Sequence, residues 1–180
     1  MKKLLISIAL ASATVAVGAC AHRPETAAQQ RTLEQRANAT ISAMQQRDPG
    51  LRNLLAASSA YIVFPEIGKG GFVVGGASGM GVLYERGIPT GSVRLTQASV
   101  GALAGGQTFA ELLVIRDPYG VQKLKMGQLK LGADVSAVAL TSGAAASATG
   151  GMSVFVMPRG GLMVDVSVAG QQLKFEPSAG

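Results

Sequence analysis

The chain has 180 residues and a formal net charge of +6, from 16 lysine and arginine residues against 10 aspartate and glutamate residues. It contains no tryptophan, and its few aromatic residues are not interleaved with a run of basic residues, so the positive charge does not indicate nucleic-acid binding. A mild positive balance is compatible with an anionic lipid surface.

The N-terminus has the layout of a secretory leader. Two lysines precede an apolar run over residues 4–17, which is shorter than the roughly 20 residues that span a bilayer. The residues Val17-Gly18-Ala19-Cys20 resemble a bacterial lipobox, in which the cysteine is lipidated and becomes the mature N-terminus. Ordinary cleavage after Ala19 is the alternative, but it would leave an exposed, unpaired thiol in an exported protein. We therefore expect a signal peptide over residues 1–19 and lipid attachment at Cys20.

The residue after the cysteine is Ala21, a pattern that in bacterial lipoproteins favours sorting to the outer membrane. The expected location is therefore the outer membrane, with the protein facing the periplasm and anchored through Cys20. Residues 20–32 are polar and alanine-rich and are predicted to be a lipidated tether. Residues 33–180 have a length that suits one domain.

Two helices are predicted at the start of this domain. A helical period runs from Leu33 through Ala37, Ile41 and Met44 and is broken by Asp48-Pro49-Gly50. A second, short helix is expected over residues 51–59, where leucines share one face.

Short strands dominate the rest of the chain. The predicted segments are apolar or alternating and are separated by turn residues: 61–64, 72–74, 81–84, 92–96, 109–115, 122–126, 153–157, 162–168 and 172–175. Residues 133–151 are small and weakly polar, and they suit a strand followed by a loop. The fold class is therefore α+β, with an antiparallel β-sheet or partly closed barrel covered by one or two N-terminal helices.

The glycine-rich stretch from Phe64 to Gly87 invites comparison with phosphate-binding loops. A P-loop requires Ser or Thr after Gly-Lys, and here Gly70 follows Gly68-Lys69. A dinucleotide fingerprint requires a third glycine where this chain has Val73. Both templates fail, so the main interpretation is that these glycines shape bent strands.

A weak internal echo adds a second interpretation. Lys69-Gly70-Gly71 is matched ninety residues later by Arg159-Gly160-Gly161, and each triplet follows an apolar strand that ends in proline. Both units are predicted to be hairpins whose turn holds a cation and a glycine pair. These six residues are candidates for a lipid-headgroup site, because exposed backbone N–H groups beside a cation can bind phosphate. Two ordinary hairpins are the simpler alternative.

A second basic surface is predicted from Lys123 and Lys125, which alternate on one face of an expected strand, together with Lys130. On an anionic membrane each cation would add about 1 kcal/mol of affinity. The alternative is a solvated face without a binding role.

Catalysis, metal binding and a cofactor are not expected. His22 is the single histidine and lies in the tether, so neither a histidine-dependent triad nor a Cys/His zinc site can be assembled. The carboxylates are scattered along the chain, at Glu66, Glu85, Glu111, Asp134 and Asp165. A paired-carboxylate site is the alternative that the sequence leaves open, but isolated acids of this kind are usually solvated, so the protein is predicted not to be an enzyme.

Several short motifs together resemble the SYLF lipid-binding domain family, also called the actin-binding Ysc-type domain. They occur in this order: Ala60-Tyr61-Ile62-Val63-Phe64-Pro65, Lys69 with Gly71-Phe72, Gly79-x-Gly81-Val82-Leu83, Ala98-Ser99-Val100-Gly101, Lys130-Leu131-Gly132-Ala133-Asp134 and Gly161-Leu162. The resemblance runs from about Asp48 to Lys174 and implies phospholipid binding; in some eukaryotic members it also implies actin binding.

The predicted function is therefore a lipid-anchored envelope protein whose SYLF-like domain binds anionic phospholipid headgroups. Nucleic acid is not an expected partner. Neither is actin, which a periplasm-facing lipoprotein would not meet. Two alternatives stay open, namely an interaction lipoprotein that binds another envelope protein, and a carrier that encloses a lipid tail in its β structure.

Overall fold

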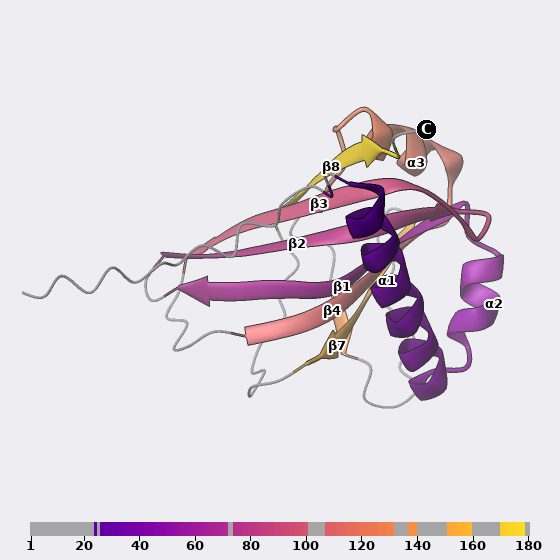
Figure 1. Cartoon of the computed structure of the whole chain (residues 1–180), viewed down its shortest axis with the longest axis horizontal. Coiled ribbons are helices and arrows are strands. Elements are labelled where there is room, and N and C mark those ends of the chain that lie inside the picture. The colour runs from indigo at the N-terminus through magenta and orange to yellow at the C-terminus, as the bar shows by residue number, and fades with distance from the viewer. Residues whose placement is uncertain are drawn as a thin grey trace, which may run out of the picture.

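The computed structural model describes residues 24, 26–71, 74–100, 107–131, 137–139, 151–159 and 170–178. Within these ranges the strands form one sheet in the order β5-β8-β3-β2-β1-β4-β7-β6, and helices accompany it (Figure 1). All neighbouring strands are antiparallel except β6 and β7, which are parallel. The predicted α+β fold is confirmed, and the sheet is open, with β5 and β6 at its edges.

The elements have the following bounds. The helices are α1 (Ala27–Arg47), α2 (Leu51–Ala56) and α3 (Pro118–Lys125). The strands are β1 (Ala60–Gly71), β2 (Val74–Glu85), β3 (Ile88–Val100), β4 (Gln107–Ile115), β5 (Lys130–Leu131), β6 (Ala137–Ala139), β7 (Met152–Pro158) and β8 (Gln171–Pro177). The predicted strand over residues 162–168, and most of residues 133–151, lie outside the described residues.

Helix α1 begins at Ala27, within the segment expected to be tether. A capping box explains this early start, because the Thr26 hydroxyl accepts a hydrogen bond from the Gln29 backbone N–H at 3.2 Å and the Gln29 side chain accepts one from the Thr26 N–H at 3.1 Å. The predicted apolar period is confirmed, since Leu33, Ala37 and Met44 are buried against the sheet. None of the helices in the described ranges combines the length and the apolar character needed to cross a membrane.

The sheet has two apolar faces. One face, which we call the helix face, packs Val63, Val82 and Leu112 against α1 and α2 (Figure 1). The other, which we call the concave face, carries Phe64 and Leu113 and packs against α3. Because both faces are covered, β4 is buried without interruption from Phe109 to Ile115.

The sheet curls strongly around its concave face. The Gln171 side chain on β8 donates a hydrogen bond to Glu111 on β4, although β3, β2 and β1 lie between these two strands. In a flat sheet, four strand steps of about 4.8 Å would separate the two backbones by about 19 Å. That distance is too great for the two side chains to bridge, so the curl brings β8 and β4 together.

Glycines on β2 allow part of this shape. The register of β1 shifts between Val63 and Glu66, a bulge that also accommodates Pro65 inside the strand. Across from the bulge, a Cβ on Gly81 would lie 2.8 Å from the Val63 carbonyl oxygen and 2.7 Å from the Phe64 ring. The interpretation of these glycines as shape-setting residues therefore holds at Gly81, where a side chain would collide with the neighbouring strand.

Two local predictions were wrong. Residues 122–126 are not a strand, because they belong to α3 and its C-cap. Asp117 caps that helix by accepting the Gly120 N–H at 2.8 Å, and Pro118 occupies its first turn. The expected turn at Lys69-Gly70-Gly71 is also absent, because β1 continues to Gly71 and pairs with β2 there.

Candidate functional site

Lys69 lies near the end of β1 on the concave face of the sheet. Its residue partners are Ala77 on β2 and Gln107 on β4, and only 8% of Lys69 is exposed. Gly70 and Gly71 continue the β1–β2 ladder in extended conformation. The segment therefore does not form a turn that would present a series of free amides to a phosphate.

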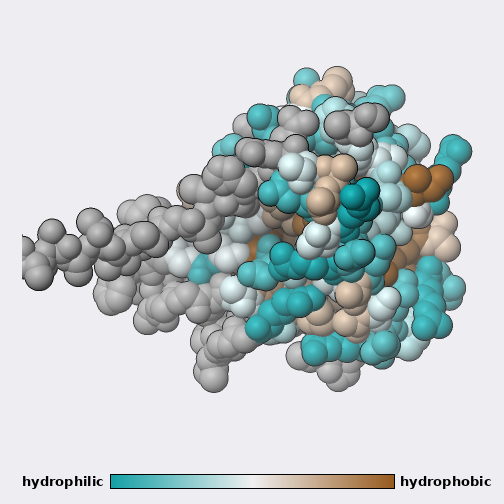
Figure 2. Space-filling view, in the orientation of Figure 1, coloured by the Kyte–Doolittle hydropathy of each residue, from teal (hydrophilic) through white to brown (hydrophobic). Residues whose placement is uncertain are grey.

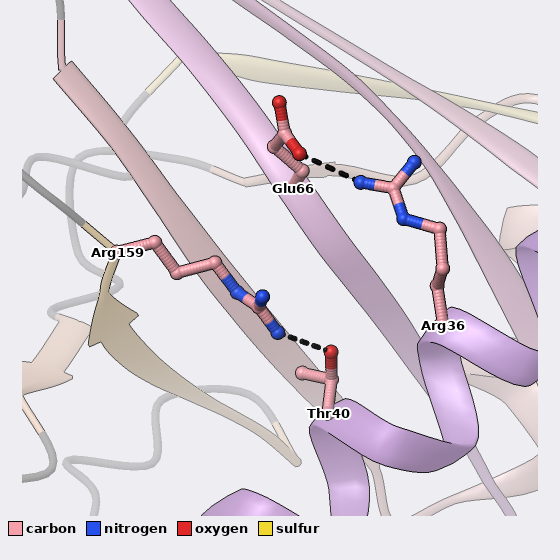
Figure 3. Close-up of polar contacts among 4 residues, drawn as sticks. All are labelled: Arg36, Thr40, Glu66 and Arg159. Carbon is pink, nitrogen blue, oxygen red and sulfur yellow. Dashed lines mark hydrogen bonds and ion pairs between the residues drawn. The ribbon is translucent and has the colours of Figure 1, made fainter.

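Arg159 follows β7 and points toward α1 on the helix face (Figure 3). Its backbone N–H donates to the Thr108 carbonyl at 3.0 Å, which extends the ladder beyond Pro158. Its guanidinium Nη2 donates to the Thr40 hydroxyl on α1 at 2.7 Å. Arg159 thus holds α1 on the sheet, and the neighbouring candidates Gly160 and Gly161 lie outside the described residues.

The two echoed cations do not form one site. Gly68 pairs with Thr108 and Thr108 bonds to Arg159, so Lys69 and Arg159 are at similar levels with β4 between them. Lys69 shares the concave face with Ile67, however, whereas Arg159 lies on the helix face. The echo in the sequence therefore corresponds to two nearby strand ends whose charged side chains diverge.

In a second contact on the helix face, the arginine belongs to α1 and its partner belongs to the sheet. Arg36 of α1 donates to the Glu66 carboxylate on β1 at 2.6 Å (Figure 3), and both side chains are about half exposed, at 52% and 53%. Exposed ion pairs of this kind contribute about 0–1 kcal/mol. Hydrophilic residues cover much of the surface where α1 lies (Figure 2), so this side of the molecule has the character of a solvated face.

Helix α3 presents the most distinctive exposed side chains. Tyr119 and Met126 are 63% and 58% exposed, and their spacing of seven residues places them on the same side of the helix. The Lys123 Nζ lies 4.5 Å from the centre of the Tyr119 ring. Gly120, Val121 and Leu124 form the buried side, so the outward side of α3 combines large apolar groups with lysine.

Lys125 connects α3 to the β2–β3 hairpin. Its Nζ lies 2.8 Å from Oε1 of Glu85, and Thr90 donates a second hydrogen bond to the same carboxylate. Partial burial raises the pKa of Glu85, but the hydrogen bonds from Lys125 and Thr90 outweigh this and lower it below its ordinary value. Ile88, the residue opposite Glu85 in the hairpin, is 64% exposed. Because Glu85 bonds Lys125, Ile88 lies close to the C-terminal end of α3.

A groove of about 240 Å³ continues this surface between the end of α3 and strands β3 and β8. Arg94 and Lys174 sit directly opposite each other on these strands, and Leu129 and Leu173 supply apolar lining. The remaining lining residues are Thr96, Gly127 and Gln172. Cross-strand neighbours of like charge repel each other, so an anion bound in the groove would relieve that repulsion. The Glu176 carboxylate already supplies part of the negative charge that Arg94 requires, since its Oε1 lies 3.8 Å from the Arg94 guanidinium.

We use the name α3 surface for the exposed and half-buried residues of this region together with the groove: Ile88, Tyr119, Lys123, Lys125, Met126, Arg94 and Lys174. The region is continuous, because Gly127 of the groove follows Met126 and because Lys125 lies 5.9 Å from the Phe175 ring on β8. Lys130 also belongs to this edge, since it pairs with Gln172 on β8. Of the second basic surface predicted from the sequence, Lys123 and Lys125 lie on a helix instead of a strand and contact Tyr119 and Glu85 respectively, and the backbone of Lys130 is at the neighbouring sheet edge.

The sequence reasoning missed the apolar members of the α3 surface. A usable signal was present, because Asp117-Pro118 is a typical helix start and Val121 and Leu124 have helical spacing. Recognising that helix would have placed Tyr119 and Met126 together on its outer side. Arg94 and Lys174 gave no such signal, since eighty residues separate them and only the register of β3 with β8 makes them neighbours.

The chemistry of this region is that of binding. Among the described residues, no three histidine, cysteine, aspartate or glutamate side chains come together in a way that could hold a metal ion. The α3 surface instead offers cations beside exposed apolar groups, an arrangement that suits a ligand with a negative head and an apolar body.

Part of the chain matches a known protein family. Residues 96–179 match the family model named Ysc84, which is described as a Las17-binding protein actin regulator. No curated protein matches the chain. The matched range begins within β3 and includes α3 and β8, so it contains most of the α3 surface.

Proposed function

Because residues 96–179 belong to the SYLF (Ysc84) family, we propose that this protein is a lipid-anchored component of the cell envelope whose domain binds anionic phospholipid headgroups without catalysis. The family supports a lipid- or actin-related binding domain in general. The narrower choice of anionic phospholipid rests on the composition of the α3 surface.

The observation that carries the proposal is the mixture of exposed groups on α3. Tyr119 and Met126 project on one side of the helix with Lys123 between them, and Ile88 adds another apolar group nearby. Tyrosine and other amphipathic side chains favour the boundary between headgroups and acyl chains, while lysine favours the phosphates. A helix with such an outward side suits a membrane surface better than bulk water.

The groove extends this contact to a single headgroup. Arg94 and Lys174 line the groove as cross-strand partners, so a phosphate between them would interact with both cations. Each cation near an anionic surface is worth about 1 kcal/mol and is screened by salt within about a Debye length. Binding should therefore be strongest at low ionic strength and should weaken as salt is added.

Vesicle flotation of residues 21–180 tests this function. Vesicles of phosphatidylcholine alone should leave the domain in solution, and vesicles containing phosphatidylglycerol should carry it upward at low salt. Lys123→Ala with Lys174→Ala should weaken flotation about tenfold, from two contributions of about 1 kcal/mol that are partly screened. No binding to anionic vesicles at low salt would refute the proposed function.

A matched control separates the site from net charge. Arg47→Ala with Arg52→Ala removes the same two charges from exposed positions on α1 and α2, and this pair should retain binding. Lys69→Ala with Arg159→Ala tests the site predicted from the sequence echo. Loss of binding in that variant, with normal binding in the Lys123/Lys174 variant, would move the site away from α3.

The cellular placement is a separate proposal that rests on the lipobox-like residues before Cys20. Lipid attachment there, with several acyl chains, would hold the protein at the outer membrane on its periplasmic side. Metabolic labelling with a radioactive fatty acid should mark the wild-type protein and not Cys20→Ala. An unlabelled wild-type protein in the soluble periplasmic fraction would contradict this placement.

A protein partner from the envelope is the second candidate, because exposed tyrosine, methionine and isoleucine also suit a protein interface. A photoreactive amino acid at position 119 would distinguish the two. Crosslinks to lipid support membrane contact, whereas a single stoichiometric protein adduct, in a protein that does not float with vesicles, supports the rival.

A further inference from the structure

A buried acid and a buried amide meet on the concave face. Glu111 on β4 and Gln171 on β8 are both 0% exposed. Gln171 Nε2 donates a hydrogen bond to Glu111 Oε2 at 2.9 Å. The second oxygen of each group, Glu111 Oε1 and Gln171 Oε1, is also buried and has no hydrogen-bond partner in the part of the chain that the structure describes.

One proton would provide for both of these oxygens. An ionised carboxylate and an amide oxygen can only accept hydrogen bonds, so neither can serve the other. A protonated carboxyl group has an O–H that can donate to the amide oxygen while its other oxygen accepts from the amide N–H. Acid and amide then form a closed ring of two hydrogen bonds, and no buried polar atom of the pair is left over.

The orientation of the amide does not change this conclusion. The oxygen and nitrogen of a glutamine amide are assigned from their hydrogen bonds, so the reversed orientation has to be considered. It would place the Gln171 oxygen against Glu111 Oε2, and two acceptors in contact again require a proton on the acid. Both orientations therefore favour a neutral Glu111.

We propose that Glu111 is protonated in the folded protein near neutral pH, that it pairs with Gln171 through two hydrogen bonds, and that this pair is a pH-sensitive clasp which holds β8 to β4 across the curled sheet. When the acid ionises, one of the two bonds is lost and two buried acceptors face each other. The clasp then loosens and the contact between β8 and β4 weakens.

The surroundings of Glu111 contain little positive charge that would favour its ionised form. Its strand neighbours are Phe64 on β1 and Val156 on β7, both apolar. Lys69 is the charged residue of β1 on the concave face, and the structure shows no ion pair between it and Glu111. On α3, Lys123 lies over Tyr119 and Lys125 bonds Glu85, so both are engaged elsewhere.

The direction of the titration agrees with the geometry. Removal of the carboxyl group from water raises the pKa of Glu111 to about 7, although the hydrogen bond from Gln171 acts in the opposite direction. The clasp thus lies close to the point at which a modest change of pH alters it. The clasp does not depend on lipid binding. Because β8 also carries Gln172 and Lys174, which line the groove beside α3, loosening the clasp would shift one wall of that groove.

Two measurements on the purified chain test the clasp. Carbon-13 labelling of glutamate side chains and NMR titration should show the Glu111 carboxyl changing near pH 7, whereas ordinary glutamates change near pH 4.3. A Glu111 carboxyl that titrates at or below about pH 5 would overturn the proposal. This measurement uses the wild-type protein and stands even if a variant fails to fold.

The second measurement is hydrogen exchange of β8, compared at pH 6 and pH 9 after correction for the intrinsic pH dependence of exchange. The backbone amides of β8 should lose at least tenfold in protection in the wild type at pH 9. Glu111→Gln keeps two amide hydrogen bonds at any pH and should keep its protection, while the exposed-site control Glu66→Gln should behave like the wild type. Equal pH dependence in the wild type and in Glu111→Gln would show that the clasp does not exist.

Discussion

Substitution of Gly81 by alanine tests how the glycine-rich strands obtain their shape. An added Cβ would lie 2.8 Å from the Val63 carbonyl oxygen and 2.7 Å from the Phe64 ring, both closer than such contacts normally allow. Phe64 is fully buried and cannot move aside, and the carbonyl belongs to the neighbouring strand. Since overpacking of this kind costs about 1–3 kcal/mol, Gly81→Ala should lower the melting temperature by about 2–12 °C.

Gly68 supplies the matched control on the adjacent strand. No atom lies within 4 Å of a Cβ built at Gly68, so the same change adds a methyl group without a collision. Gly68→Ala should be neutral or stabilise the fold by up to about 1 kcal/mol, because it restricts the unfolded chain.

Urea unfolding and thermal scans of both variants, followed by circular dichroism, would measure the difference. Equal stability of Gly81→Ala and the wild type would refute the argument from close approach. An equal loss of stability in both variants would instead mean that any side chain in this stretch is harmful, whatever space surrounds it.

Three further predictions concern buried or clamping polar groups. The pKa of Glu111 is raised from 4.5 to about 7, so between these pH values the folded state holds a proton that the unfolded state has released. The free energy of unfolding therefore falls by about 3 kcal/mol as the pH rises through this window. Urea titrations at several pH values should show this slope in the wild type and not in Glu111→Gln. Arg159→Ala and Thr40→Val should each weaken the attachment of α1, and a double-mutant cycle on urea stability should give a coupling of about 1 kcal/mol, with zero coupling contradicting the clamp. Tyr84→Phe removes the 2.8 Å hydrogen bond to Asn38 and should cost about 1 kcal/mol in thermal unfolding, whereas an unchanged midpoint would mean that the bond is not formed in solution.

The sequence was most informative where a structure depends on local periodicity. The spacing of Leu33, Ala37 and Met44 predicted the buried side of α1, and the apolar segments predicted strands that became β1, β4 and β7. The ordered glycine and lysine motifs predicted the family, which the match over residues 96–179 confirms. These inferences succeed because burial repeats along one element and leaves a trace in consecutive residues.

Local pattern failed where two periods competed. Lys123, Leu124 and Lys125 alternate as a strand does, but Asp117 caps a helix upstream and Leu124 packs into the core with Val121 three residues before it. Helix α3 therefore forms, and its outward side is amphipathic in a way that the alternation concealed. Capping and burial decided between two conformations that the alternation alone could not distinguish.

The sequence by itself determined the α+β class, the N-terminal helix and its apolar side, and the family. The tertiary structure alone decided which charges are neighbours. Strand register sets Lys174 against Arg94, and the alternation of side chains sends Lys69 and Arg159 to opposite faces of the sheet. The curl of the sheet brings Gln171 to Glu111 across sixty residues of chain, because contacts between distant strands depend on how the whole sheet bends and leave no periodic trace in the sequence.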